Sequence, residues 1–184
     1  MGRGASLLYN KPPNEKELGA AVCGSQNRSR CRMDATIKRL LGQTRTIAVV
    51  GMSSRPTRAG YYVPAYLQTA GYRIIPVNPA LDSALGEKAY PDLAAVPEPI
   101  DLVLLFRRPE DVPPHVAEAI AVGAKAIWMQ SGIVNEEAAA TARAAGLDVV
   151  MDRCIKIEHA RFHGGLHLAG FDTGVISSKR QVVA

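Results

Sequence analysis

The sequence predicts an α/β domain in which an open parallel sheet of about five strands carries helices on both faces. Short apolar runs alternate with amphipathic stretches of about ten residues, which is the pattern of repeated β-α-β units. Hydrophobic residues make up 47% of the 184 residues, but aromatic residues make up only 5%. This composition suits a buried parallel sheet covered by helices of small residues better than an aromatic-rich β-sandwich.

Five runs have the length and composition of buried strands. Each is rich in Val, Ile, Leu, Ala or Met, and each is followed by glycine or polar residues that indicate a loop. Since crossover connections are right-handed, we expect a Rossmann-type sheet with the strand order 3-2-1-4-5. The predicted strands are Thr46–Val50, Tyr72–Val77, Asp101–Phe106, Ala126–Met129 and Asp148–Met151.

Helical signals occupy the segments before and between these strands. Asp34 is placed to cap a short first helix that Gly42 ends, and Gly71 and Gly146 follow two of the others. Aspartate is a favoured N-cap, and glycine is favoured just after a helix C-terminus. The predicted helices are Ala35–Leu41, Gly60–Ala70, Pro113–Val122 and Asn135–Ala145.

The chain changes character near Met33. The preceding residues are rich in Gly, Pro, Asn, Ser and Arg and show no hydrophobic period, so we expect residues 1–33 to be a poorly ordered extension of a domain at 34–184. Residues 1–32 hold six basic and two acidic residues, a net charge of +4 out of the total of +5. The remaining residues hold 16 basic and 15 acidic residues, a net charge of +1. The domain is nearly neutral, so the net charge does not indicate nucleic-acid binding.

The sequence also indicates where the protein works. No apolar run reaches the roughly 18 residues of a membrane helix, and the first residues lack the apolar core of a secretory signal. Cys23, Cys31 and Cys154 form neither a CxxC pair nor a dense framework, which favours free thiols in a reducing compartment. We therefore expect a cytoplasmic protein without a membrane partner.

Ligands of open parallel sheets bind beyond the carboxyl ends of the strands. Gly51 ends the first predicted strand, and two serines and two arginines follow before the next helix, which would form a phosphate cradle at a helix N-terminus. Arg107 and Arg108 add charge after the third strand. Glycine at this position also occurs in α/β domains without a nucleotide, and arginines at loop ends are often only solvated.

The spacing of these residues disfavours NAD. The dinucleotide fingerprint G-x-G-x-x-G is absent, because the glycine that follows Gly51 is Gly60. At the end of the second strand, where NAD enzymes carry an acidic residue for the ribose, this chain has Asn78.

Four motifs follow one another along the chain. They are Val50–Arg58 (VGMSSRPTR), Tyr72–Pro79 (YRIIPVNP), Gly123–Gln130 (GAKAIWMQ) and Val150–His159 (VMDRCIKIEH). Together they resemble the family of small bacterial CoA-binding domain proteins. That family is similar to the N-terminal coenzyme A (CoA) domain of the succinyl-CoA synthetase α subunit, and the resemblance covers residues 36–161.

The resemblance implies a Rossmann-type fold with CoA or an acyl-CoA at the carboxyl edge of the sheet. It also implies which residues contact the phosphates, the adenosine end and the remaining side of the ligand. By their positions in the motifs, these are Gly51, Ser53, Ser54, Arg55 and Arg58 for the phosphates, Val77, Asn78, Pro79, Phe106, Arg107 and Arg108 for the adenosine end, and Gln130, Ser131 and Gly132 for the remaining side.

The synthetase subunit continues into a second domain with a phosphorylated histidine, and this chain ends before such a domain. We therefore expect a binding protein for CoA or acyl-CoA, regulatory or a carrier, rather than an enzyme. One alternative is a nucleotide-dependent enzyme, either an NAD(P)-linked oxidoreductase or one component of a split acyl-CoA synthetase. Another is an interaction protein with a vestigial pocket.

Two further groups could carry chemistry. His159, His163 and His167 would share one face of a helix and could bind zinc, but a Gly-Gly pair interrupts them and no carboxylate or thiol completes the set. We therefore expect no metal site. Cys154 follows Arg153 after the fifth strand. It is either a reactive thiol, suited to a mixed disulfide with CoA, or a small buried cysteine at the sheet edge.

Overall fold

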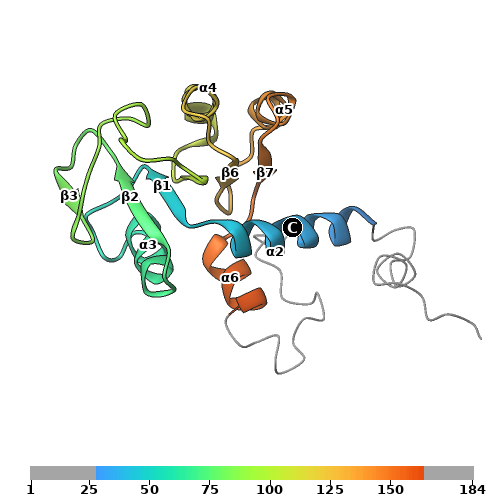
Figure 1. The fold of residues 1–184 in the computed structure, drawn as a ribbon, viewed down its shortest axis with the longest axis horizontal. Helices are drawn as coiled ribbons and strands as arrows, with labels where there is room; N and C mark the ends of the chain where they lie inside the picture. The colour runs from blue at the N-terminus through green and yellow to red at the C-terminus, as the bar shows by residue number, and fades with distance from the viewer. Residues whose placement is uncertain (1–27, 164–184) are drawn as a thin grey trace, which may run out of the picture. The chain divides into compact units, whose positions relative to one another are not determined.

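The computed structural model describes residues 28–163. The chain divides into two compact units, Met1–Ala35 and Thr36–Ala184, and the sheet belongs to the second. Strands and helices alternate along it except between β2 and β5, where a short β3–β4 hairpin takes the place of a helix (Figure 1). The elements are α2 (Arg28–Gln43), β1 (Thr46–Val50), α3 (Ala59–Thr69), β2 (Arg73–Val77), β3 (Ser83–Ala84), β4 (Glu87–Lys88), β5 (Leu102–Leu105), the 3-10 helix η1 (Pro109–Asp111), α4 (Val112–Ala121), β6 (Ala126–Met129), α5 (Glu136–Ala144), β7 (Asp148–Val150) and α6 (Ile155–His163).

Five strands form one parallel sheet in the order β2-β1-β5-β6-β7. The predicted fold class, an α/β domain with an open parallel sheet, is confirmed. In the register of the sheet, Val50 lies beside Val77 on one side and Leu105 on the other. The carboxyl ends of β1, β2 and β5 therefore lie level with one another, and the loops that follow them meet at one edge.

One strand lies elsewhere than predicted. The third long strand, β5, pairs with β1 and not with β2, so the observed order is 2-1-3-4-5 instead of 3-2-1-4-5. The segment between β2 and β5 explains the difference. After the β3–β4 hairpin, the backbone of Tyr90 donates to the carbonyl of Pro76 and accepts from the N–H of Asn78, both at 2.9 Å. This segment occupies the position beside β2.

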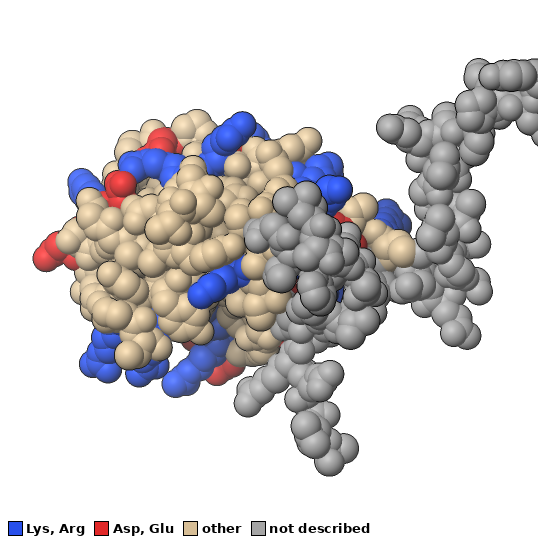
Figure 2. Space-filling model, turned by 90° about the horizontal axis from the view of Figure 1, so that it is seen from below, with Lys and Arg blue, Asp and Glu red and all other residues tan. Residues whose placement is uncertain are grey.

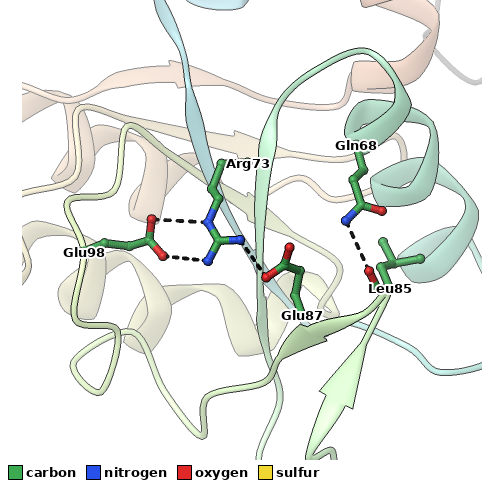
Figure 3. A network of polar contacts seen from close by, with 5 residues as sticks. All are labelled: Gln68, Arg73, Leu85, Glu87 and Glu98. Atoms are coloured by element: carbon green, nitrogen blue, oxygen red, sulfur yellow. Dashed lines mark hydrogen bonds and ion pairs between the residues drawn. The ribbon is translucent and has the colours of Figure 1, made fainter.

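The hairpin is tied to its neighbours by polar contacts (Figure 3). Arg73, at the start of β2, donates to Glu87 at 2.6 Å and to Glu98 at 3.1 Å, and these hydrogen bonds raise the pKa of its guanidinium. Gln68 of α3 donates to the carbonyl of Leu85 in the hairpin turn at 3.2 Å. The segment beside β2 is therefore held in place from both β2 and α3.

Helices cover both faces of the sheet. Helices α4 and α5 pack together on one face, and α3 and α6 pack together on the other (Figure 1). Every residue of β5 and β6 is buried. Because both faces are covered, these strands are continuous apolar runs without alternation. One cluster of buried residues joins the sheet to α4 and α5, as with Val50, Leu105, Val116 and Ala139.

The observed helices depart from the predicted ones at the two ends of the described chain. Helix α2 begins at Arg28, so Asp34 lies inside it and is not its N-cap. Helix α6 was not predicted, because the region after Cys154 has no clear hydrophobic period. In contrast, α5 begins as expected, with Asn135 Oδ1 accepting from the N–H of Ala138 at 2.9 Å.

Three sequence expectations concern features outside the sheet. Cys31 is disulfide-bonded, so the expectation of free thiols is wrong for Cys31, whereas Cys154 is a free thiol. Within residues 28–163, no helix is both long and apolar enough to cross a bilayer. The predicted extension at 1–33 lies mostly outside the described residues, and its boundary stays a prediction.

Candidate ligand-binding site

A cavity of about 820 Å³ lies at the carboxyl edge of the sheet. Its walls come from the loops that follow all five strands of the parallel sheet and from the first turns of α3. The carboxyl edge is where open parallel sheets bind ligands. The lining residues are Gly51, Met52, Ser53, Ser54, Arg55, Arg58, Ala59, Gly60, Tyr62, Val63, Asn78, Leu81, Phe106, Gln130, Ser131, Ile133 and Cys154.

Two glycines bring helix α3 close to the end of β1. Gly51 has a φ of 82°, and a Cβ there would lie 2.5 Å from the carbonyl oxygen of Phe106. A Cβ at Gly60 would lie 2.9 Å from the carbonyl oxygen of Gly51. The N–H of Ser53 donates to the carbonyl of Gly60 at 3.1 Å. Side chains at either glycine would therefore push the loop, the helix and β5 apart.

The start of α3 has the properties of an anion site. Arg58 precedes the helix with an extended backbone and makes no side-chain capping hydrogen bond. The first N–H groups of a helix have no acceptor within it, and they carry the positive end of the helix dipole. Arg55 and Arg58 line the cavity and are exposed, and no Asp or Glu is among the lining residues of the described chain. This end of the cavity favours a phosphate.

Hydrogen bonds fix the loops around this end. The Nδ2 of Asn78 donates to the carbonyl of Met52 at 2.7 Å, and its Oδ1 accepts from the N–H of Ala80 at 3.0 Å. The Oγ of Ser53 accepts from the N–H of Arg55 at 3.1 Å. The Nδ2 of Asn78 thus joins the loops after β1 and β2, and its Oδ1 fixes the turn of its own loop, so its first role is to shape the cavity.

Gln130 lines the cavity from the loop after β6. It is only 5% exposed, and its Nε2 has no hydrogen-bond partner among the described residues. A buried donor without a partner costs about 1–3 kcal/mol.

Nine of the fourteen predicted site residues line the cavity. The other five do not, and each has a different position. Val77 is buried in β2, whereas Pro79 and Arg108 are exposed. Arg107 lies against Gly51, and its buried Nε has no partner among the described residues. The N–H of Gly132 donates to Asp152 Oδ1 at 2.8 Å. The nine are Gly51, Ser53, Ser54, Arg55, Arg58, Asn78, Phe106, Gln130 and Ser131.

Sequence reasoning missed several lining residues. Gly60 has a visible signal, since it is the next glycine after Gly51 and opens the following helix. Cys154 stands out in the sequence only as a single thiol. The others are ordinary apolar or small residues whose position depends on tertiary packing, namely Met52, Ala59, Tyr62, Val63, Leu81 and Ile133.

A second cavity of about 560 Å³ lies at the amino edge of the sheet and includes Arg45, Tyr72, His159 and His163. The Nδ1 of His159 lies 3.0 Å from the hydroxyl of Tyr66, and its ring stacks on that of His163 at 5.3 Å. Burial, and then the neighbouring His163, lower the pKa of His159.

The three-histidine pattern is only partly described. His159 and His163 lie on α6, but His167 lies outside the described residues. Across residues 28–163, no three His, Cys, Asp or Glu side chains are grouped as metal ligands. On the face shown in Figure 2, the visible Lys and Arg side chains of the described chain are scattered among uncharged residues rather than gathered in one patch.

Comparison with known proteins decides the family. The model of the CoA binding domain matches residues 45–160, from β1 to α6. The chain belongs to this CoA-binding domain family. The matched segment contains every residue that lines the carboxyl-edge cavity.

Three known proteins are similar to this chain over the domain. The uncharacterized protein YneT of Bacillus subtilis strain 168 is 47% identical over 126 residues, which cover 68% of this chain and 93% of YneT. A solved structure of a hypothetical protein from Pyrococcus horikoshii OT3 is 40% identical and has a TM-score of 0.68. The matched region covers 70% of this chain and 91% of that protein. The ADP-forming acetate–CoA ligase II of Archaeoglobus fulgidus is 32% identical over 127 residues, which are 65% of this chain but only 19% of the ligase.

Proposed function

We propose that the protein binds CoA or an acyl-CoA in the carboxyl-edge cavity and catalyses no reaction by itself. The observation that carries the proposal is the charge of the lining: two arginines and an uncapped helix N-terminus, with no carboxylate among the described lining residues. Such a wall attracts the phosphates of CoA. Membership of the CoA-binding domain family supports the same ligand.

The two ends of the cavity suit the two ends of CoA. Arg55, Arg58 and the start of α3 would bind the phosphate groups. Gln130 and Cys154, which follow β6 and β7, would lie along the pantetheine arm. Asn78, at the end of β2, offers no carboxylate for a ribose, which disfavours a dinucleotide.

A second candidate function is that of one component in a split acyl-CoA synthetase. The similarity to the ADP-forming ligase favours it, since that enzyme contains a segment related to this domain. In the part of the chain that the structure describes, however, Cys154 is the one lining residue with a nucleophilic thiol, and no His or carboxylate accompanies it in the wall.

We further propose a cytoplasmic location.

Titration calorimetry with CoA, NAD and NADP tests the ligand. We expect CoA to bind and both dinucleotides to bind at least about tenfold more weakly, a difference of 1.4 kcal/mol. The double variant Arg55→Ala/Arg58→Ala should lose most of the CoA response. Binding of NAD without binding of CoA would contradict the proposal.

An activity assay separates the two candidates. The full chain, incubated with acetate, ATP and CoA, should form no acetyl-CoA above the rate without protein. Steady formation of acetyl-CoA that depends on this protein would favour the synthetase component instead.

A further inference from the structure

The amino-edge cavity contains a pair of histidines for which the proposed function has no role. His159 and His163 are four residues apart on α6, and both line this cavity. Residues four apart lie on the same face of a helix, and two histidines with this spacing can bind one metal ion. The glycine pair at 164–165, which argues against a zinc site in the sequence, follows His163 and does not separate the two histidines.

The two rings have the separation that one shared metal ion requires. Their centroids lie 5.3 Å apart. A metal ion about 2.1 Å from an imidazole nitrogen lies roughly 3.2 Å from the centroid of that ring, so two rings at a tetrahedral angle have centroids about 5.2 Å apart. The ring planes differ by 27°, and His163 is exposed. A rotation of the His163 ring about χ2 would therefore bring a nitrogen of each ring to the same ion.

The hydroxyl of Tyr66 holds the ring of His159 in place. It lies 3.0 Å from Nδ1 of His159, which is only 9% exposed. The rings of Tyr66 and Tyr72 both lie edge to face against the imidazole at 5.5 Å. When Nδ1 carries the proton and donates to Tyr66, Nε2 keeps its lone pair. Histidines that bind metals usually donate their second ring N–H to such a partner, which fixes both the tautomer and the ring orientation.

The rest of the lining indicates which kind of ion fits. Leu41 and Gly42 belong to the last turn of α2, and Ala70 is the C-cap of α3, so the negative ends of two helix dipoles lie at this cavity. No Asp, Glu or Cys is among its lining residues in the described chain. Calcium and magnesium are bound through oxygen atoms, mainly carboxylates, whereas imidazole nitrogens suit zinc, nickel and copper.

We propose that His159 and His163 bind one divalent transition-metal ion, of the class of Zn²⁺, Ni²⁺ or Cu²⁺, in the amino-edge cavity. The two imidazoles supply two coordination positions, and water fills the others, so the ion keeps positions open to further ligands. The site uses no residue of the carboxyl-edge cavity. It therefore does not depend on the proposed binding of CoA.

Titration calorimetry of the full chain with Zn²⁺, Ni²⁺ and Mg²⁺ tests the site. We expect Zn²⁺ and Ni²⁺ to bind and Mg²⁺ to give no response at equal concentration. In His163→Gln, the affinity for Zn²⁺ should fall at least about tenfold, because one of the two protein ligands is lost. Since His163 is exposed, this variant should keep the melting temperature of the metal-free parent. His115→Gln removes an imidazole on α4, outside the cavity, and should bind Zn²⁺ as the parent does.

Two further measurements locate the ion and test the sign of its charge. In NMR spectra, Zn²⁺ should shift the imidazole signals of His159 and His163 together and leave those of His115 unchanged. Arg45 is an exposed cation that lines the same cavity, so its charge opposes a metal ion. Arg45→Gln should therefore bind Zn²⁺ several-fold more tightly than the parent at low salt.

Three results would overturn the proposal. If the parent binds neither Zn²⁺ nor Ni²⁺, the site does not exist. If His163→Gln binds Zn²⁺ as tightly as the parent, the ion lies away from this histidine pair. If Arg45→Gln binds Zn²⁺ more weakly than the parent, the cavity favours an anion instead of a cation.

Discussion

The two edges of the sheet are built in different ways. At the amino edge, Asp101 accepts from the N–H groups of Arg45 at 2.9 Å and Thr46 at 3.1 Å, and from Lys125 at 2.6 Å. Arg73 is likewise paired with two glutamates at this edge. At the carboxyl edge, Arg55 and Arg58 have no ion-pair partner among the described residues, and the Gln130 amide lacks an acceptor.

This difference shows where the fold is stabilised and where it can bind. Polar groups that are already paired contribute to stability but offer little to a ligand. Unpaired donors and cations are costly or neutral for the folded chain alone, and they become favourable when an anion or carbonyl oxygen arrives. Substitutions at the amino edge should therefore lower stability without lowering affinity, and substitutions of the carboxyl-edge arginines should do the reverse.

The largest effect is expected at Gly51, where the carboxyl edge depends on close packing. In Gly51→Ala, the positive φ and the 2.5 Å approach to Phe106 should lower the free energy of unfolding by about 3 kcal/mol or more. Gly123 also has a positive φ, but a Cβ there would meet no atom within 4 Å. Gly123→Ala is thus a matched control that should cost only about 1–2 kcal/mol. Equal losses in urea denaturation would contradict the close approach.

Asp101→Ala tests how much the hydrogen bonds at the amino edge contribute to stability. It leaves the backbone N–H groups of Arg45 and Thr46 without their acceptor, so we expect a loss of about 1–3 kcal/mol in the free energy of unfolding. CoA affinity, measured by calorimetry below the melting temperature, should stay unchanged. A parallel loss of affinity would show that the two edges are not independent.

The same residue predicts an acid dependence. Burial alone would raise the pKa of Asp101, but hydrogen bonds from Lys125, Arg45 and Thr46 outweigh it and lower the pKa below 3.8. The folded carboxylate therefore stabilises the protein above that pH, and this contribution is lost as the pH falls through the lowered pKa. The stability difference between the parent and Asp101→Ala should shrink in that acid range.

Arg58→Ala removes one cation from the carboxyl edge. A charge-assisted contact with phosphate is worth about 1.5–3 kcal/mol, so CoA binding should weaken about tenfold or more at modest salt. Arg143→Ala, on the exposed side of α5, removes the same charge away from the cavity and should have little effect. Arg107→Ala should have a smaller effect than Arg58→Ala, since Arg107 does not line the cavity. Calorimetry of the three variants checks this order.

The smallest effect concerns His159. Burial and His163 hold its folded pKa below the ordinary 6.5, so the unfolded chain binds the proton more readily. The stability that neutral His159 provides is present above pH 6.5 and is lost as the pH falls below that value. Melting temperatures between about pH 7.5 and 5.5 should fall less in His159→Gln than in the parent.

The location of the loops at the carboxyl edge could be predicted from the sequence. The loops after the strands were identified because apolar runs end sharply at Gly51, Asn78 and Gln130, and parallel strands bring such ends to one edge. The position of β5 could not be predicted, because a short pairing at Tyr90 takes the place beside β2 and leaves no periodic signal.

Side-chain roles at the site were harder to predict than its location. Asn78 lines the cavity, and its amide also bonds Met52 and Ala80, which the sequence did not indicate; its contact with the adenosine end stays a prediction. The four predicted arginines looked equivalent as sequence, yet only Arg55 and Arg58 line the cavity, because Arg107 turns against Gly51. The position of Cys154 in the cavity wall follows a turn at Asp152, whose φ of 56° has no sequence pattern of its own.

The most direct measurement of the central claim is an amide chemical-shift titration of the full chain with CoA. We predict that the largest shifts fall on Ser53, Gly60, Gln130 and Cys154 at the carboxyl edge, and that Arg45, Tyr72 and His163 around the amino-edge cavity stay unchanged. Shifts concentrated on the second set would place the ligand at the wrong edge of the sheet and contradict the claim.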